Sequence, residues 1–234
     1  MKVFAISDLH MSINNPKPMD IFGPSWDNYI EEIWADWAQK VADDDIVIIG
    51  GDISWAMHLE DAVADLKEIR KNKGKIVMIR GNHDYWWASI GKVRAALPPD
   101  MWALQNDALK FDGVIICGTR GWNLPDTKGF NADDQKILDR EVLRLEMSLV
   151  HAKKLQTNNE KIICVIHYPP FNIRREASPF TKLMEQYGVS WVVYGHLHFP
   201  QPKERLQPLI EKNGIKYYLT SCDLVKNKLT EIGY

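Results

Sequence analysis

Five of the seven histidines in this chain stand in short polar motifs that also contain aspartate, asparagine or glycine. Carboxylate and imidazole groups in such number are ligands for divalent ions such as Mn, Fe, Zn, Ni or Co. None of the motifs contains cysteine, which argues against a structural zinc cage. The residue types therefore predict a metal centre built from Ser7-Asp8-Leu9-His10, Gly50-Gly51-Asp52, Gly81-Asn82-His83-Asp84, His167-Tyr168-Pro169-Pro170 and Gly195-His196-Leu197-His198.

The number of candidate ligands indicates two metal ions rather than one. A single ion would not need so many donors, and Asp52 has two carboxylate oxygens with which it can bridge a pair of ions. Asp8 and His10 are separated by one residue, as are His196 and His198. In extended backbone such residues point the same way, so both members of each pair can reach one cluster. The glycines in the motifs permit tight turns and a close approach of the backbone.

Each motif directly follows or ends a short run rich in Val and Ile. The runs are continuous rather than alternating, which is typical of strands buried on both faces. In open α/β sheets, ligands gather beyond the carboxyl ends of the strands. We therefore expect the motifs to meet at one edge, behind strands at residues 3–6, 46–49, 76–79, 162–166 and 191–194, with a further strand at 114–117.

Amphipathic helical patterns separate these runs, which indicates an α/β layer architecture in one domain covering residues 1–234. Residues 216–220 are predicted to form a late strand, which we expect to be antiparallel. Residues 11–25 are rich in Pro and Asn and are predicted to form a long loop. The helices are expected at 26–41, 59–69, 132–155 and 179–187.

In order and spacing, the five motifs resemble those of the calcineurin-like metallophosphoesterase superfamily, whose pattern is DxH, GD, GNH[DE], H and GHxH. The resemblance covers nearly the whole chain and implies a two-sheet β-sandwich flanked by helices, in four layers α/β/β/α. Residues 17–23 and 118–122 are similar to those of a bacterial subgroup of predicted phosphohydrolases. Carried over by position, one metal would be held by Asp8, His10, Asp52 and His198, and the other by Asp52, Asn82, His167 and His196.

The resemblance implies a metal-dependent phosphoric ester hydrolase with catalytic residues Asp52 and His83. Two ions would activate a bridging water as the attacking hydroxide, and His83 would assist the leaving group or hold the phosphate. In protein serine/threonine phosphatases the second motif continues as GDxxDRG. Here Trp55 and Ala56 replace the Asp that orients the histidine and a phosphate-binding Arg. Protein phosphatase activity is therefore not expected, and Asp84 stays a candidate for orienting His83.

Outside the five motifs, arginines and tryptophans offer weaker signals. Arg120 is a candidate for binding a substrate phosphate, because a guanidinium pairs with such groups through two hydrogen bonds. Arg174 and Arg175 are lesser candidates for which a surface role is favoured. Trp26 and Trp86 are expected to pack in the core or the cleft rim, with stacking on a base as the alternative. His58 and His151 are expected at the surface.

Composition bounds the partners. A hydrophobic fraction of 45% permits a substantial core, and a net charge of -2 argues against nucleic acid and an anionic membrane as partners. No apolar run approaches the roughly 20 residues of a membrane span, and no leader pattern is visible, so a cytoplasmic setting is expected. The partner expected is a small metabolite or nucleotide carrying a phosphate mono- or diester. A nuclease and a non-catalytic scaffold are the alternatives. Buried free thiols are expected for Cys117, Cys164 and Cys222.

Overall fold

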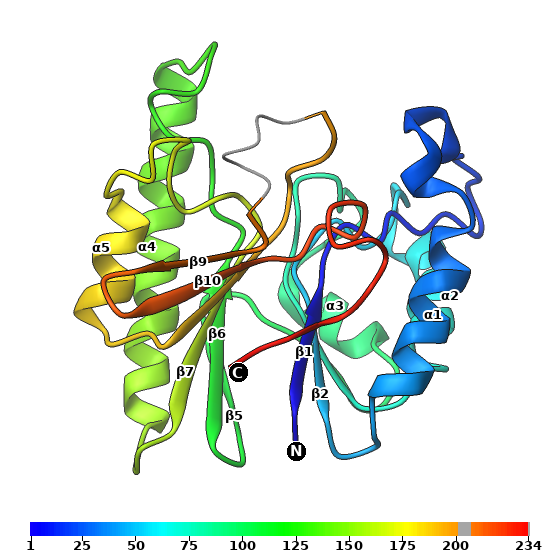
Figure 1. Ribbon diagram of the computed structural model, residues 1–234, viewed down its shortest axis with the longest axis horizontal. Helices are drawn as coiled ribbons and strands as arrows, with labels where there is room; N and C mark the ends of the chain where they lie inside the picture. Colours follow the sequence, from blue (N-terminus) through cyan, green and yellow to red (C-terminus); the bar gives the residue numbers. More distant parts are fainter. Residues whose placement is uncertain (201–206, 234) are drawn as a thin grey trace.

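Two sheets face each other at the centre of the computed structural model, and helices cover their outer faces (Figure 1). The structure describes residues 1–200 and 207–233, so the predicted domain of residues 1–234 includes a few residues outside the described part. The first sheet has the order β11-β1-β2-β3-β4, with β1 to β4 parallel. Its strands are Val3–Ile6 (β1), Ile46–Ile49 (β2), Lys75–Met78 (β3), Met101–Ala103 (β4) and Thr230–Glu231 (β11).

The second sheet has the order β5-β6-β7-β8-β10-β9, with antiparallel strands at both edges. Its strands are Ala108–Phe111 (β5), Val114–Thr119 (β6), Lys161–Ile166 (β7), Trp191–Tyr194 (β8), Leu209–Lys212 (β9) and Ile215–Leu219 (β10). The late strand predicted at 216–220 is thus β10. It is antiparallel to β9, as expected, but it also pairs in parallel with β8.

The helices lie on opposite sides of the pair of sheets, α1 and α2 on one side and α4 and α5 on the other (Figure 1). The predicted α/β/β/α layers are therefore confirmed. The helices are Tyr29–Lys40 (α1), Leu59–Ile69 (α2), Ile90–Ala96 (α3), Ala132–Leu155 (α4) and Pro179–Gln186 (α5), and the loop at 11–25 contains short 3-10 turns at Asp20–Phe22 and Pro24–Trp26.

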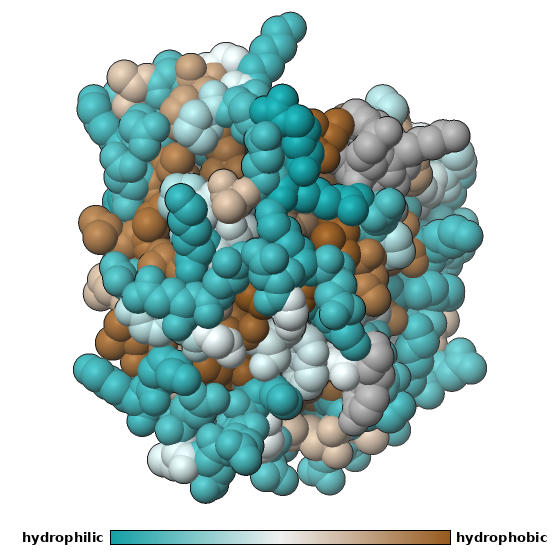
Figure 2. Space-filling model, turned by 60° about the vertical axis from the view of Figure 1, so that its left-hand side comes forward, coloured by the Kyte–Doolittle hydropathy of each residue, from teal (hydrophilic) through white to brown (hydrophobic). Residues whose placement is uncertain are grey.

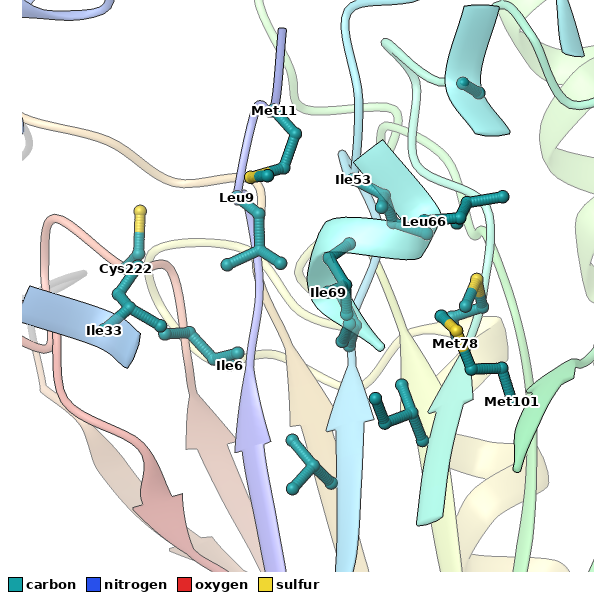
Figure 3. Packing of buried hydrophobic residues seen from close by; sticks show 14 of the residues in the cluster. Ile6, Leu9, Met11, Ile33, Ile53, Leu66, Ile69, Met78, Met101 and Cys222 are labelled. Atoms are coloured by element: carbon teal, nitrogen blue, oxygen red, sulfur yellow. The ribbon is translucent and has the colours of Figure 1, made fainter. Parts of the chain in front are cut away.

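The core is divided by the alternation of side chains along the strands. In β1, Val3 and Ala5 face the other sheet, whereas Phe4 and Ile6 face the helices. Figure 3 shows Ile6 near side chains of α1 and α2. Both faces are buried, which explains why the strand runs are apolar throughout and confirms the prediction made from them. The three cysteines are free and buried, also as predicted.

Helix α4 begins at an N-cap, Asn131, whose side chain accepts backbone N–H groups of Asp133 and Asp134. Figure 2 shows the side of the molecule that carries α4 and α5, where apolar atoms lie among charged ones. His151 on this helix was expected to be solvated, which is wrong: it is half-buried, and its Nδ1 accepts the Ala108 N–H at 3.1 Å. No helix among the described residues is long and apolar enough to cross a membrane.

Candidate metal centre

The two sheets are joined at the carboxyl ends of their strands. Ser7, directly after β1, shares a hydrogen bond of 2.7 Å with the hydroxyl of Thr220, directly after β10. The Ser7 N–H also donates to the Thr220 carbonyl, and the Cys222 N–H donates back to Ser7. The loops after β1, β2 and β3 in the first sheet therefore meet the loops after β7 and β8 in the second.

The first group of converging side chains comes from both sheets. Asp8, His10 and His198 place one ligand atom each within 4.8 Å of one another. The His198 Nε2 lies 3.6 Å from Asp8 Oδ1. The His10 Nε2 lies 3.8 Å from Asp52 Oδ2, so Asp52 borders this group, as the sequence predicted.

The second group adjoins the first. Asp8, Asp52 and His167 also place ligand atoms within 4.8 Å of one another. The His167 Nε2 lies 3.4 Å from Asp52 Oδ2 and 2.9 Å from Asn82 Oδ1. Asn82 Oδ1 is also 2.8 Å from His196 Nδ1. The structure thus brings all seven predicted ligand side chains together, with Asp52 between His10 and His167 and with Asp8 common to both groups.

Outer partners fix two of the imidazoles. The His198 Nδ1 lies 2.9 Å from Asp223 Oδ1, and the His167 Nδ1 lies 2.9 Å from the Gly50 carbonyl. Metal-binding histidines usually use the second nitrogen in this way. Asp223 was not predicted. The available signal was its position: an acidic residue that follows β10 as the other motifs follow their strands.

The backbone at the centre is strained, and one explanation offered from the sequence is wrong. Asp8, His10, Asp52 and His196 all have positive φ, of 63°, 47°, 51° and 70°. Asp8 and His10 therefore do not converge through extended backbone; left-handed turns bring them together. Such conformations cost about 1–3 kcal/mol each and persist where the surroundings hold them. The expected close approach at glycine is confirmed at Gly195, where a Cβ would lie 2.6 Å from Asp8 Oδ2.

Burial and charge shift the pKa values within the centre. Burial raises the pKa of Asp8 to about 6 and lowers the pKa values of His10 and His196 to about 3. For Asp52 and His167, burial opposes the charged forms, but the two groups stabilise each other. The pKa of Asp52 is held well below its usual range, and that of His167 rises to about 9. Asp52 is therefore negatively charged at neutral pH, which is the form that binds a cation.

His83 lies beside these groups, and its orientation does not depend on Asp84. Its backbone N–H donates to Asp52 Oδ1 at 2.8 Å. Its ring packs on Trp55, with centroids 4.5 Å apart, and Trp55 also stacks on His10 at 4.7 Å. Asp84 instead accepts backbone N–H groups of Ile53, Ser54 and Gly81 and the indole N–H of Trp86. Trp55 thus positions His83 by packing, where a protein phosphatase would have a carboxylate.

The tryptophans, arginines and histidine considered outside the five motifs lie in different parts of the structure, some buried and some exposed. Trp26 and Trp86 are buried, which confirms the packing role and excludes Trp86 as an exposed stacking surface. His58 is exposed just before α2, as expected. Arg120 is largely buried, with its guanidinium 4.6 Å from the Trp122 ring. Arg174 is exposed and pairs with Glu176 at 3.0 Å.

The donor set fits divalent metal ions. It consists of carboxylate and amide oxygens with imidazole nitrogens and lacks thiolate, which suits hard to borderline cations. Among the described residues, the buried His10 Nδ1 has no hydrogen-bond partner. Asn82 Oδ1 is crowded by two imidazole nitrogens, an arrangement that a shared cation would stabilise. The residues that could hold metal are Asp8, His10, Asp52, Asn82, His167, His196 and His198.

Comparisons with known proteins agree with this geometry. The model of the calcineurin-like phosphoesterase family matches residues 1–200. A protein from Thermus thermophilus has the same fold, with a TM-score of 0.62 and 13% identity over 98% of this chain and 96% of that chain. A protein of unknown function from Aquifex aeolicus has a TM-score of 0.53 and 12% identity over 98% and 95%. No curated protein matches the sequence. On the strength of the family match, this chain belongs to the calcineurin-like phosphoesterases.

Proposed function

We propose that this chain hydrolyses phosphate mono- or diesters of a small metabolite or nucleotide. The observation that carries the proposal is the convergence of seven donor side chains from two sheets on one point, where Asn82, His196 and His198 stay partly exposed. Two divalent ions held there would supply an activated water and polarise the phosphoryl group.

His83 is the side chain placed to act on the leaving group. Its ring stands next to the donor cluster, 5.7 Å from the His10 ring between centroids. Its buried Nδ1 has no hydrogen-bond partner among the described residues. Burial lowers the pKa of His83, so the neutral ring predominates near pH 7, and the smaller protonated fraction is the form that can donate to a departing alkoxide oxygen.

The space beside the centre suits a small leaving group. A cavity of about 290 Å³ is lined by His196, Tyr168 and Trp122, and the Tyr168 ring packs 4.0 Å from the His196 ring. Its volume is at the lower end of the range for small-molecule pockets. The walls combine aromatic rings with polar side chains such as Asn123 and Asn172, which suits a small organic group that carries hydrogen-bonding atoms.

The proposal is tested by the hydrolysis of p-nitrophenyl phosphate and bis-p-nitrophenyl phosphate with added Mn²⁺. We expect turnover that needs metal, is abolished in Asp52→Asn and is kept in Asp44→Asn, which changes an exposed carboxylate. The preferred ester would separate a monoesterase from a diesterase. A chain that binds about two ions and turns over neither ester, nor any of a panel of phosphorylated metabolites and nucleotides, would instead support a non-catalytic scaffold.

A further inference from the structure

A second polar cavity, of about 280 Å³, lies near the metal centre, and four of its eleven lining residues are arginines. Arg80 follows β3, Arg120 follows β6, and Arg140 and Arg144 lie on α4. The backbone ties this cavity to the metal centre, because the N–H groups of His167 and Tyr168 both donate to the Arg120 carbonyl.

The charges around this cavity, here called the arginine pocket, do not balance. It is lined by four guanidinium groups and one carboxylate, Glu141. Glu141 is buried and already engaged: it accepts the Thr119 hydroxyl at 2.6 Å and the Arg144 guanidinium at 2.7 Å. Arg120 reaches the same carboxylate only at 3.7 Å. One negative charge is thus shared among several positive ones.

In the described part of the chain, two of the arginines have no anionic partner of their own. Among residues 1–200 and 207–233, the side chains of Arg80 and Arg140 form no hydrogen bond or ion pair, and both repel Arg120. The Nε atoms of Arg80 and Arg120 are buried without a hydrogen-bond partner. Buried N–H groups without an acceptor are costly, so the pocket gains most from a ligand that brings several acceptor oxygens.

We propose that the arginine pocket binds a phosphate-type oxyanion. A guanidinium presents parallel N–H groups that match two oxygens of a phosphate, and the cavity is large enough for one or two such groups. The oxyanion is either a second phosphoryl group of the substrate or a separate ligand. The binding site itself does not depend on the proposed hydrolysis; only its assignment to the substrate does.

Calorimetric titration of pyrophosphate into metal-free protein tests the site. We expect saturable binding of one anion per chain and a loss of affinity of about tenfold or more in Arg80→Gln/Arg140→Gln. Arg174→Gln removes an exposed guanidinium elsewhere and should leave the affinity unchanged. Thermal melting of the double variant checks that the fold is kept, and Arg140→Gln alone, which changes an exposed helix residue, provides the affinity comparison if the Arg80 change unfolds the protein. Absent saturable binding, or equal affinity in the double variant and the wild type, would overturn the proposal.

Steady-state kinetics distinguishes the two sources of the oxyanion. If it is a second phosphoryl group, the double variant should raise the KM for a sugar bisphosphate about tenfold or more and leave the KM for p-nitrophenyl phosphate unchanged. If it is a separate ligand, both KM values should stay the same while the calorimetric affinity falls. An enzyme inactive on every ester would contradict the proposed function, and the calorimetric result would still decide the pocket.

Discussion

Two polar clusters lie at the same edge of the sheets, and they differ in how their charges are compensated. In the metal centre each charged group has an internal partner, such as Asp52 beside His167 at 3.4 Å or His198 beside Asp223 at 2.9 Å. In the arginine pocket, four guanidinium groups face one carboxylate, and Arg80 and Arg140 have no counter-ion among the described residues.

The two clusters therefore suit ligands of opposite charge. The metal centre can bind a cation without a build-up of positive charge, because its histidines are neutral when they bind metal and its carboxylates are negative. Guanidinium groups keep their protons in proteins, so a ligand that offsets the charge of the arginine pocket must be an anion. A site that takes a cation next to a site that takes an anion suits a substrate with more than one phosphoryl group.

The largest effect is expected at the point where the metal centre meets the leaving group. His83→Ala should lower kcat about 10²- to 10⁴-fold, because a positioned proton donor contributes this much. Metal content should remain unchanged, since the predicted ligands are other residues. His58→Ala removes an exposed histidine and serves as control. If kcat stayed within a factor of about two of the wild type, His83 would have only a packing role beside Trp55.

A smaller effect is expected from the outer partner of a ligand. Asp223→Asn removes the charge that faces His198 Nδ1 at 2.9 Å, and such changes typically cost about 10- to 100-fold in metal affinity. Competition with a chromogenic chelator measures this loss. Asp112→Asn changes an exposed carboxylate between β5 and β6 and should bind metal like the wild type. Equal affinity in both variants would show that Asp223 does not support His198.

The two clusters should also differ in how their ligand affinity depends on pH. Because the pKa of His167 is raised to about 9, this ring is protonated at pH 7.5 and must lose its proton when metal binds. Metal affinity should therefore rise with pH up to about 9, by up to tenfold per unit, with proton release detected by calorimetry in two buffers. The affinity of the arginine pocket for sulfate should not change over this pH range, since neither sulfate nor the guanidinium groups titrate in it. Metal binding without proton release in the wild type would contradict the prediction that a protonated His167 becomes a metal ligand.

The metal centre could be predicted from the sequence because its residues follow their strands directly. Parallel strands end at one edge, so motifs scattered from Asp8 to His198 converge once the strands are recognised. Asp223 was missed because it lacks a histidine or glycine neighbour of the kind that marked the other motifs. The positive φ at Asp8 and His10 was also missed, because residue type alone does not report the turn that the tertiary contacts impose.

The arginine pocket could not be predicted in the same way. Arg80, Arg120 and Arg140 come from three separate elements, and their separation in sequence has no period that a helix or strand would produce. Of these three arginines, only Arg120 was a candidate, because a guanidinium can pair with a phosphate through two hydrogen bonds. Short edge elements such as β4 and β5 were missed as well, because β4 has only three residues and Lys110 interrupts the apolar pattern of β5. These strands lead into the loop that contributes Gln105 and Asn106 to the pocket.

The smallest predicted effect tests the charge imbalance itself. Arg140→Gln should raise the free energy of unfolding of the anion-free protein by about 0.2–1 kcal/mol at low salt, because it removes a positive charge that repels Arg120. Gln and Arg have similar helix propensities, so the change leaves α4 intact. The gain should vanish in about 1 M salt, where screening acts within about 3 Å. Lys136→Gln, on the same helix, removes a cation paired with Asp133 and should give no gain in urea unfolding. Should Arg140→Gln instead lower stability at low salt, Arg140 would have a favourable partner within the protein, and the arginine pocket would lose the imbalance that calls for an anion.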